Sequence, residues 1–373
     1  QPRPPLTTIA LVPAGRHMPR NGAAAALLKA VGGRLSQHLR GFGPVLVLDR
    51  SSVSAHFGDA EAEALLGRLT SRFHRSKLAA WLAQMEERFR FILMLGGVEE
   101  GRYARAAAGW ADLCVSQADH VLLVAEAGGP VGRVEVGAAE RREERMRREG
   151  TRVELVLVWP EQRVSAAAAI ATAAAISSQA GPHGTGQWRE RRPHVLRHHH
   201  LRAGKPEDLS RLARHLAGVA VGVLLCGGGA SIGLSHLGAL RALEDAGVPV
   251  DFVGGTSQGA LLAALYAQNG HTRNLLPRVR HFTQANTLVH HLLFDLTLPV
   301  LSLFHGAASS AALKEALGEE ALIEDMVLPF ITCSVSLGGG TDKNRAAGAA
   351  APAPASVASG AAAGGKEDTY IRT

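Results

Sequence analysis

Residues 221–268 decide the fold of the second half of the chain and read VGVLLCGGGASIGLSHLGALRALEDAGVPVDFVGGTSQGALLAALYAQ. The apolar run Val221 to Leu225 has the length and branching of a buried strand, and a run of glycines follows it. A second short strand, Asp251 to Val253, leads into Gly-Gly-Thr-Ser-Gln-Gly and then into the apolar helix Ala260 to Tyr266. This order predicts two strand-to-helix turns in one α/β sheet, with a serine in the second turn.

Ser257 is the candidate nucleophile of the second turn. In a G-x-S-x-G sequence the serine lies on a strained turn, so the residues that pack closely against it must lack a Cβ. Gly255 and Gly259 meet this need, and Thr256 and Gln258 complete the elbow. Amides at the start of the helix and in the upstream glycine loop can then stabilise an oxyanion by about 3–4 kcal/mol per donor.

The stretch resembles the opening of a patatin-like phospholipase domain, which has a glycine-rich oxyanion loop, then His-x-Gly, a helix and Gly-Thr-Ser-x-Gly. The matching residues are Gly227, Gly228, Gly229, His236, Gly238, Gly255, Thr256, Ser257 and Gly259. Residues 241–267, together with LTLPVLSLFHG and IEDMVLPFITCSVS downstream, most resemble the neuropathy target esterase group of lysophospholipases. Much of residues 6–220 resembles the same group.

The resemblance implies a serine lipid acyl hydrolase that acts on phospholipid or lysophospholipid esters. Ser257 would be the nucleophile, and Gly227, Gly228, Gly229 and Ala230 would form the oxyanion loop. His236 would help to hold that loop, although a packed helix histidine is an equal alternative. No metal and no organic cofactor is implied. The protein would be intracellular and work at a membrane surface, which in this group is the cytosolic face of the endoplasmic reticulum.

Two departures from the family pattern bear on activity. The loop arginine is missing, because Ala230-Ser231-Ile232-Gly233 stands in its place. The family's catalytic aspartate, in an Asp-Gly-Gly or Asp-Gly-Ala motif, is also missing, and neither Asp295 nor Asp342 fits that motif. We therefore expect an incomplete domain, truncated before the catalytic aspartate and impaired as an enzyme. Its open sheet edge would need the missing C-terminal part or a partner. A non-catalytic lipid-binding or regulatory module is the alternative.

Residues 1–180 alternate strands and helices, which predicts a doubly wound, mostly parallel, Rossmann-like sheet upstream of the catalytic domain. The expected strands are Thr8 to Val12, Pro44 to Asp49, Phe91 to Leu95, His120 to Ala125 and Arg152 to Trp159. Such sheets often bind nucleotides, but Pro13-Ala14-Gly15-Arg16 lacks both GxxxxGK[ST] and GxGxxG. Nucleotide binding is therefore the weaker alternative to a role in positioning the catalytic domain.

The remaining segments have weaker patterns. We expect a linker and connecting helix at 181–218, the patatin-like part at 219–337, and a disordered low-complexity insert with a terminal strand at 338–373. The charged run 140–148, ERREERMRR, is typical of a solvated helix face, with a lipid-headgroup contact as the alternative. His198-His199-His200 favours a basic loop or edge strand over a metal site, because no carboxylate lies at ligand spacing.

Composition narrows the class of partner. The 373 residues carry 40 Lys and Arg against 33 Asp and Glu, a net charge of +7, which favours anionic surfaces. Aromatics make up only 5% of the chain, so a membrane is favoured over nucleic acid. The 3 scattered cysteines indicate a reducing compartment and small buried side chains. The sequence contains neither an apolar run of about 18 residues nor a signal peptide, and its start at Gln1 indicates a fragment.

Overall fold

The computed structural model describes residues 7–15, 22–69, 71–97, 104–128, 134–160, 182–226, 230–273, 275–287, 307–319 and 321–333. The chain divides into two compact units, Gln1–Gln162 with Gln187–Val219 and Arg163–Gly186 with Ala220–Thr373. Each unit contains its own parallel sheet and its own apolar core.

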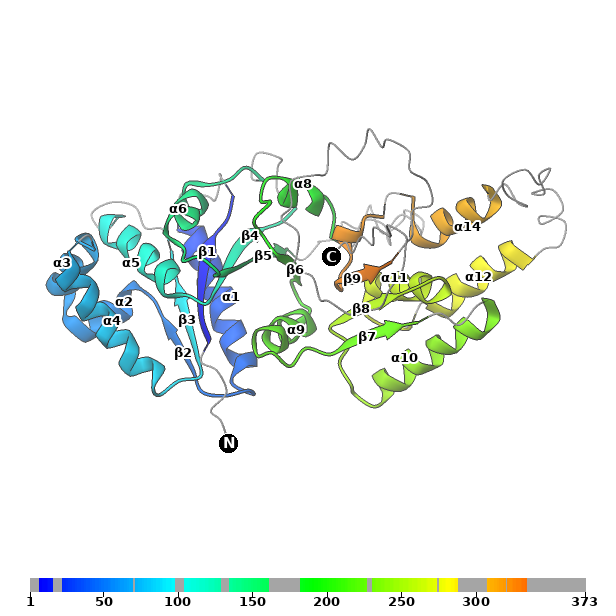
Figure 1. The fold of residues 1–373 in the computed structure, drawn as a ribbon, viewed down its shortest axis with the longest axis horizontal. Helices are drawn as coiled ribbons and strands as arrows, with labels where there is room; N and C mark the ends of the chain where they lie inside the picture. The colour runs from blue at the N-terminus through cyan, green and yellow to red at the C-terminus, as the bar shows by residue number, and fades with distance from the viewer. Residues whose placement is uncertain are drawn as a thin grey trace, which may run out of the picture. The chain divides into compact units, whose positions relative to one another are not determined.

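The first unit is built on a six-stranded parallel sheet with the order β2-β3-β1-β4-β5-β6. The strands are β1 Thr7–Pro13, β2 Val45–Leu48, β3 Phe91–Leu95, β4 His120–Glu126, β5 Arg152–Trp159 and β6 Arg197–Arg202 (Figure 1). Strand β3 is buried along its whole length, as expected where helices cover both faces of a sheet. The predicted doubly wound parallel sheet is confirmed.

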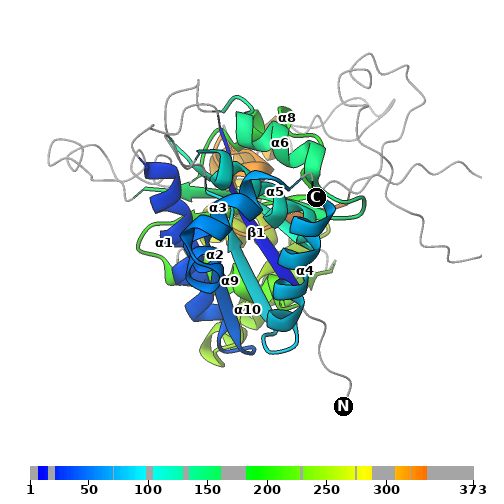
Figure 2. The same cartoon turned by 90° about the vertical axis from the view of Figure 1, so that its left-hand side faces the viewer.

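Helices cover both faces of this sheet. Helices α1 (Ala23–Leu39) and α9 (Pro206–Leu216) pack on one face through leucines such as Leu35 and Leu212. The other face carries α2 Arg50–Phe57, α3 Asp59–Gly67, α4 Arg72–Glu86, α5 Ala104–Gln117 and α6 Ala138–Met146. Figure 2 shows α1 and α4 on opposite sides of β1.

Residues 187–219 belong to the first unit, so most of the segment 181–218, which was expected to be a linker and connecting helix, is part of that unit. After the short helix α8 (Thr185–Glu190), β6 pairs with β5 and α9 packs against α1. The run of three histidines lies in β6, at the end of the strand order, so the edge-strand interpretation is confirmed. An edge strand needs few apolar residues, which is why its sequence does not stand out.

The charged run 140–148 is only partly solvated, which corrects the expected solvent-exposed face. Glu140 and Glu143 of α6 are 2% and 1% exposed. They are three positions apart and therefore lie on the same side of the helix, facing the core. Glu140 forms a buried ion pair with Arg192, which lies 52 positions further along the chain. A local sequence pattern cannot predict a partner that lies so far away in the sequence.

The second unit has a three-stranded parallel sheet with the order β7-β8-β9. Its elements are β7 Gly222–Leu225, β8 Phe252–Gly255, β9 Phe330–Thr332, α10 Ser235–Asp245, α11 Gln258–Asn269, α12 Leu275–Thr287 and α14 Ala307–Leu317, with 3-10 turns at Ala230–Leu234 and Ile323–Asp325 (Figure 1). Helix α11 packs against all three strands, and Leu261 to Ala267 are all buried. An apolar helix is thus the centre of this core.

Some predictions concern residues outside the described ranges, namely the insert at 338–373, Asp295 and Asp342. Among the helices that the structure describes, none is long and apolar enough to cross a bilayer. Cys114 is buried as expected, but Cys226 and Cys333 are exposed. Each of these two directly follows the last residue of a strand in the second sheet. Both therefore lie at the carboxyl ends of the strands rather than in the core.

Candidate active site

Ser257 lies at the junction of β8 and α11, as the N-cap residue of the helix. Its backbone has φ 55° and ψ −127°, and it is the only non-glycine residue with positive φ in the described part of the chain. Such a conformation costs about 1–3 kcal/mol and persists only where the surroundings impose it. The side chain is exposed, so the strained turn presents its hydroxyl to solvent.

Backbone contacts explain the glycines on either side of the serine. A Cβ on Gly259 would lie 2.1 Å from the carbonyl oxygen of Leu225, and a Cβ on Gly255 would lie 2.4 Å from the carbonyl group of Gly259. Rotating a side chain cannot relieve either contact, because backbone atoms form both. The glycines therefore let α11 begin directly against β7 and β8, which imposes the turn at Ser257.

Hydrogen bonds hold the turn at the carboxyl edge of the sheet. The N–H of Thr256 donates to the carbonyl of Leu225 at 3.2 Å, and the N–H of Gly259 donates to the carbonyl of Thr256 at 3.0 Å. Leu225 and Gly255 are partners in the parallel β7–β8 register, and Gly255 and Thr332 are partners in the β8–β9 register. The segment after β7 and the serine turn after β8 thus start at the same edge, as the sequence pattern predicts.

The oxyanion loop is described only in part. Residues 227–229 lie outside the described ranges, and Ala230 begins the 3-10 turn that leads into α10. His236 lies in the first turn of α10, where its Nε2 is buried and has no hydrogen-bond partner among the described residues. The oxyanion roles of Gly227, Gly228, Gly229 and Ala230 and the supporting role of His236 stay predictions.

Within the described part of the second unit, no carboxylate is hydrogen-bonded to the hydroxyl of Ser257. Asp251, just before β8, accepts a hydrogen bond from the backbone N–H of Val221, just before β7, and Asp325 accepts from two backbone N–H groups. Asp295 and Asp342 lie outside the described ranges. The described residues therefore supply an exposed serine hydroxyl on a strained turn, but no carboxylate hydrogen-bonded to it.

In the first unit, Glu140 lies against Gly15, which follows β1. Its Oε2 accepts hydrogen bonds from the backbone N–H groups of Gly15, at 2.8 Å, and of Gly137, at 2.7 Å. Arg192, which is 1% exposed, donates to both carboxylate oxygens. In a phosphate-binding loop, N–H groups after the first strand point at a phosphate. Here a carboxylate of the chain takes that position, which gives no support to nucleotide binding.

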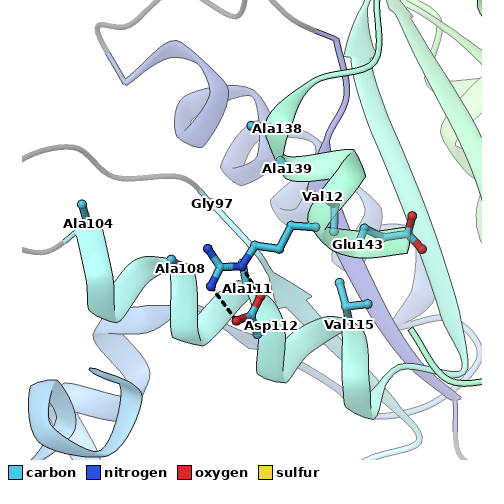
Figure 3. Close-up of a pocket in the computed structure, with 11 residues that line it drawn as sticks. Val12, Gly97, Ala104, Ala108, Ala111, Asp112, Val115, Ala138, Ala139 and Glu143 are labelled. Carbon is cyan, nitrogen blue, oxygen red and sulfur yellow. Dashed lines mark hydrogen bonds and ion pairs between the residues drawn. The ribbon is translucent and has the colours of Figure 1, made fainter. Parts of the chain in front are cut away.

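A cavity of about 130 Å³ lies at the carboxyl ends of β1 and β3, between α5 and α6 (Figure 3). Its walls are mostly small apolar side chains such as Val12 and Ala108, and Asp112 forms an ion pair there with Arg142 (Figure 3). Ligand pockets usually occupy about 300–1,000 Å³. The cavity that the described residues form is therefore too small for a nucleotide.

Glu143 lines the same cavity but has no hydrogen-bond partner for either carboxylate oxygen among the described residues. The Nη1 atom of Arg147 lies 3.9 Å from its Oε1. Burial raises the pKa of Glu143 to about 7, against the smaller opposing effect of Arg147. This carboxyl group thus changes its charge near neutral pH.

Two family models match the chain. A model described as the Neuropathy Target Esterase family P-loop like domain matches residues 5–174, and a model described as patatin-like phospholipase matches residues 223–362. The first match covers strands β1 to β5, and the second includes most of β7, Ser257 and β9.

Curated relatives match across both units. Neuropathy target esterase sws of Drosophila ananassae is 30% identical over 356 residues, which cover 89% of this chain and 21% of that protein. Neuropathy target esterase sws of Drosophila melanogaster has the same identity, with 89% and 22% covered. Lysophospholipase NTE1 of Mycosarcoma maydis is 30% identical over 381 residues, with 87% and 18% covered. The chain spans about a fifth of the length of the curated relatives it matches.

Gly259→Ala should destabilise the second unit by about 1–3 kcal/mol, because the new Cβ would overlap the carbonyl oxygen of Leu225. Gly238→Ala is the matched control, since a Cβ there meets no atom within 4 Å and alanine favours a helix. Urea denaturation of both variants and the wild type measures the difference. If the Gly259 and Gly238 variants were equally stable, the close approach of α11 to β7 would be wrong.

Glu143 should make the stability of the first unit depend on pH. Folding raises its pKa from 4.5 to about 7, so its favourable contribution is complete below pH 4.5 and is lost as the pH rises through 7. Glu143→Gln stays uncharged and should therefore gain about 2–3 kcal/mol over the wild type between pH 5 and pH 8. Urea denaturation at both pH values tests this, and parallel pH profiles would contradict the raised pKa.

Proposed function

Because the chain belongs to the neuropathy target esterase family and carries a patatin-like phospholipase domain, we propose that its second unit is a serine lipid acyl hydrolase. Its substrates are the esters of phospholipids or lysophospholipids, in line with a relative named as a lysophospholipase. The observation that carries the proposal is the strained turn at Ser257, which exposes a hydroxyl at the start of a buried helix. Turns of this kind present the nucleophile in serine hydrolases.

The proposed reaction begins when the Oγ of Ser257 attacks the ester carbonyl carbon. The tetrahedral intermediate collapses, the bond to the alcohol oxygen breaks, and the alcohol leaves with the proton from the serine. Water then hydrolyses the acyl-enzyme and releases the fatty acid. The N–H groups of Gly228, Gly229 and Ala230 would hold the oxyanion, with the positive end of α11 beside them.

The general base in the resembled family is an aspartate, and no Asp-Gly-Gly or Asp-Gly-Ala sequence occurs in the 373 residues. General-base catalysis contributes about 10²–10⁴-fold to a rate. We therefore propose that these 373 residues by themselves turn over slowly, although the hydroxyl of Ser257 is exposed on its turn.

The reaction is proposed to take place at a membrane surface, on the cytosolic face of the endoplasmic reticulum. The net charge of +7 favours anionic lipid. Large apolar side chains of the second unit are also exposed, among them Leu224 at 65% and Ile232 at 74%. Ile232 lies in the 3-10 turn that follows the glycine loop, where it could contact acyl chains.

A slow acylation experiment tests the nucleophile. The 373-residue chain is incubated with a short-chain nitrophenyl ester and analysed by mass spectrometry of its peptides. We expect an acyl group on the peptide that carries Ser257, and none on that peptide in Ser257→Ala. Ser310→Ala, which removes an exposed hydroxyl from α14, is the matched control and should acylate like the wild type.

Other outcomes would test the nucleophile, the impaired turnover and the alternative function separately. Acylation that is unchanged in Ser257→Ala, for instance on exposed Cys226, would reject Ser257 as the nucleophile. Turnover that depends on Ser257 and reaches about 10 s⁻¹, a rate typical of enzymes, would reject the impairment. Binding to lysophospholipid vesicles without any acylation would favour the alternative, a non-catalytic lipid-binding or regulatory module.

A further inference from the structure

Glu154, His199 and His215 form a cluster inside the first unit that the proposed hydrolase does not use. Glu154 lies on β5, His199 on the edge strand β6, and His215 in the last turn of α9. One potential metal-ligand atom of each side chain lies within 4.8 Å of those of the other two. Three separate elements thus direct polar atoms at one place.

Both imidazole rings contact the carboxylate of Glu154 through their Nε2 atoms. The Nε2 of His199 lies 2.9 Å from Oε2 of Glu154, and the Nε2 of His215 lies 2.9 Å from Oε1 and 3.1 Å from Oε2. The ring centroids are 5.0 Å apart, and the ring planes are tilted by 46°. The rings therefore converge on the carboxylate and do not stack on each other.

The cluster is enclosed but can be reached from solvent. The side chains of Glu154 and His199 are 3% and 9% exposed, and that of His215 is 19% exposed. On the neighbouring strand β4, the Nδ1 of His120 is also buried and has no hydrogen-bond partner among the described residues. Leu122, two positions after His120, is the register partner of Glu154, so both side chains lie on the same face of the sheet.

We propose that Glu154, His199 and His215 bind a divalent transition-metal ion, with zinc as the best fit. Two imidazole nitrogens and one carboxylate oxygen form a common zinc ligand set that leaves the fourth tetrahedral position to another ligand. Tetrahedral ligands about 2.0–2.1 Å from zinc lie about 3.3 Å from one another. For the ion to enter, the 2.9 Å separations would need to lengthen by roughly 0.4 Å, and the separation between the two histidine nitrogens, at most 4.8 Å, would need to shorten to about 3.3 Å.

The position of the cluster indicates a structural ion. Glu154 and His199 are each the third residue of a strand, so the cluster lies near the amino ends of β5 and β6. In open parallel sheets, substrates bind at the opposite, carboxyl edge. An ion here would instead link α9 to the neighbouring strands β5 and β6. Its fourth ligand would be water or the unpartnered Nδ1 of His120.

The alternation of β6 shows which histidine of the run 198–200 takes part. Successive side chains of a strand point to opposite faces. His199 faces Glu154, whereas the Nδ1 of His200 accepts a hydrogen bond from the indole N–H of Trp159 at 3.0 Å. Three adjacent histidines indeed cannot share one ion, but one of them can do so with residues from other elements.

Metal titration of the full chain tests the site. Zn²⁺ is added to metal-free protein in competition with a chromophoric chelator, and Co²⁺ is added separately for its visible spectrum. We expect one ion per chain, tetrahedral Co²⁺ bands and a higher melting temperature with Zn²⁺. His199→Gln and His215→Gln should each weaken Zn²⁺ affinity by at least about 10–100-fold, the loss seen even for outer-shell changes.

The choice of variants distinguishes a loss of zinc ligands from a loss of folding stability. Glutamine retains an N–H donor for Glu154 but is a poor zinc ligand, so both variants should keep the wild-type melting temperature in chelator. His198→Gln, on the same strand but outside the cluster, is the matched control and should keep the wild-type affinity. Equal Zn²⁺ affinity of the wild type and the His199→Gln/His215→Gln double variant would overturn the proposal. So would Co²⁺ absorption typical of thiolate ligands, which would place the ion on a cysteine.

Discussion

The close approach of α11 to β7 and β8 is the constraint on which the serine turn depends. A side chain on Gly259 or Gly255 would overlap backbone atoms, so the helix can begin this close to the strands only with glycine at both positions. The chain then has to reverse between them, and Ser257 takes the strained conformation. Full burial of leucines such as Leu262 and Leu265 contributes about 1.5–3 kcal/mol each, enough to offset a strain of about 1–3 kcal/mol.

Much of this arrangement can be predicted from the sequence. The five predicted strands of the first unit each match an observed strand to within two residues, because apolar runs that end in polar or glycine residues are typical of buried parallel strands. The elbow is equally local, since strand, Gly-x-Ser-x-Gly and helix follow one another directly. The short helices α2 and α3 were not predicted, because their apolar positions are few and are divided by Gly58.

Features that depend on distant partners could not be predicted. Charged residues at helical spacing normally face solvent, yet Glu140 is buried because Arg192 and two backbone N–H groups surround it. Likewise, no carboxylate lies at ligand spacing from the histidine run in the sequence, but pairing of β5 with β6 brings Glu154 beside His199. In both cases folding supplies the partner from tens of residues away. The sequence patterns describe each element well but not the polar contacts between elements.

The account of the second unit requires residue 257 to be exposed at the positive end of α11. The most direct measurement is the rate at which a thiol reagent modifies the cysteine introduced by Ser257→Cys, in a chain that also carries Cys226→Ser and Cys333→Ser. The account predicts rapid modification of the folded protein, faster than in urea, because a helix amino terminus lowers the pKa of a thiol. Buried Cys114 reacts only after unfolding and serves as the internal reference. A thiol at position 257 that also reacts only after unfolding would contradict the account, since residue 257 would then be part of a packed core.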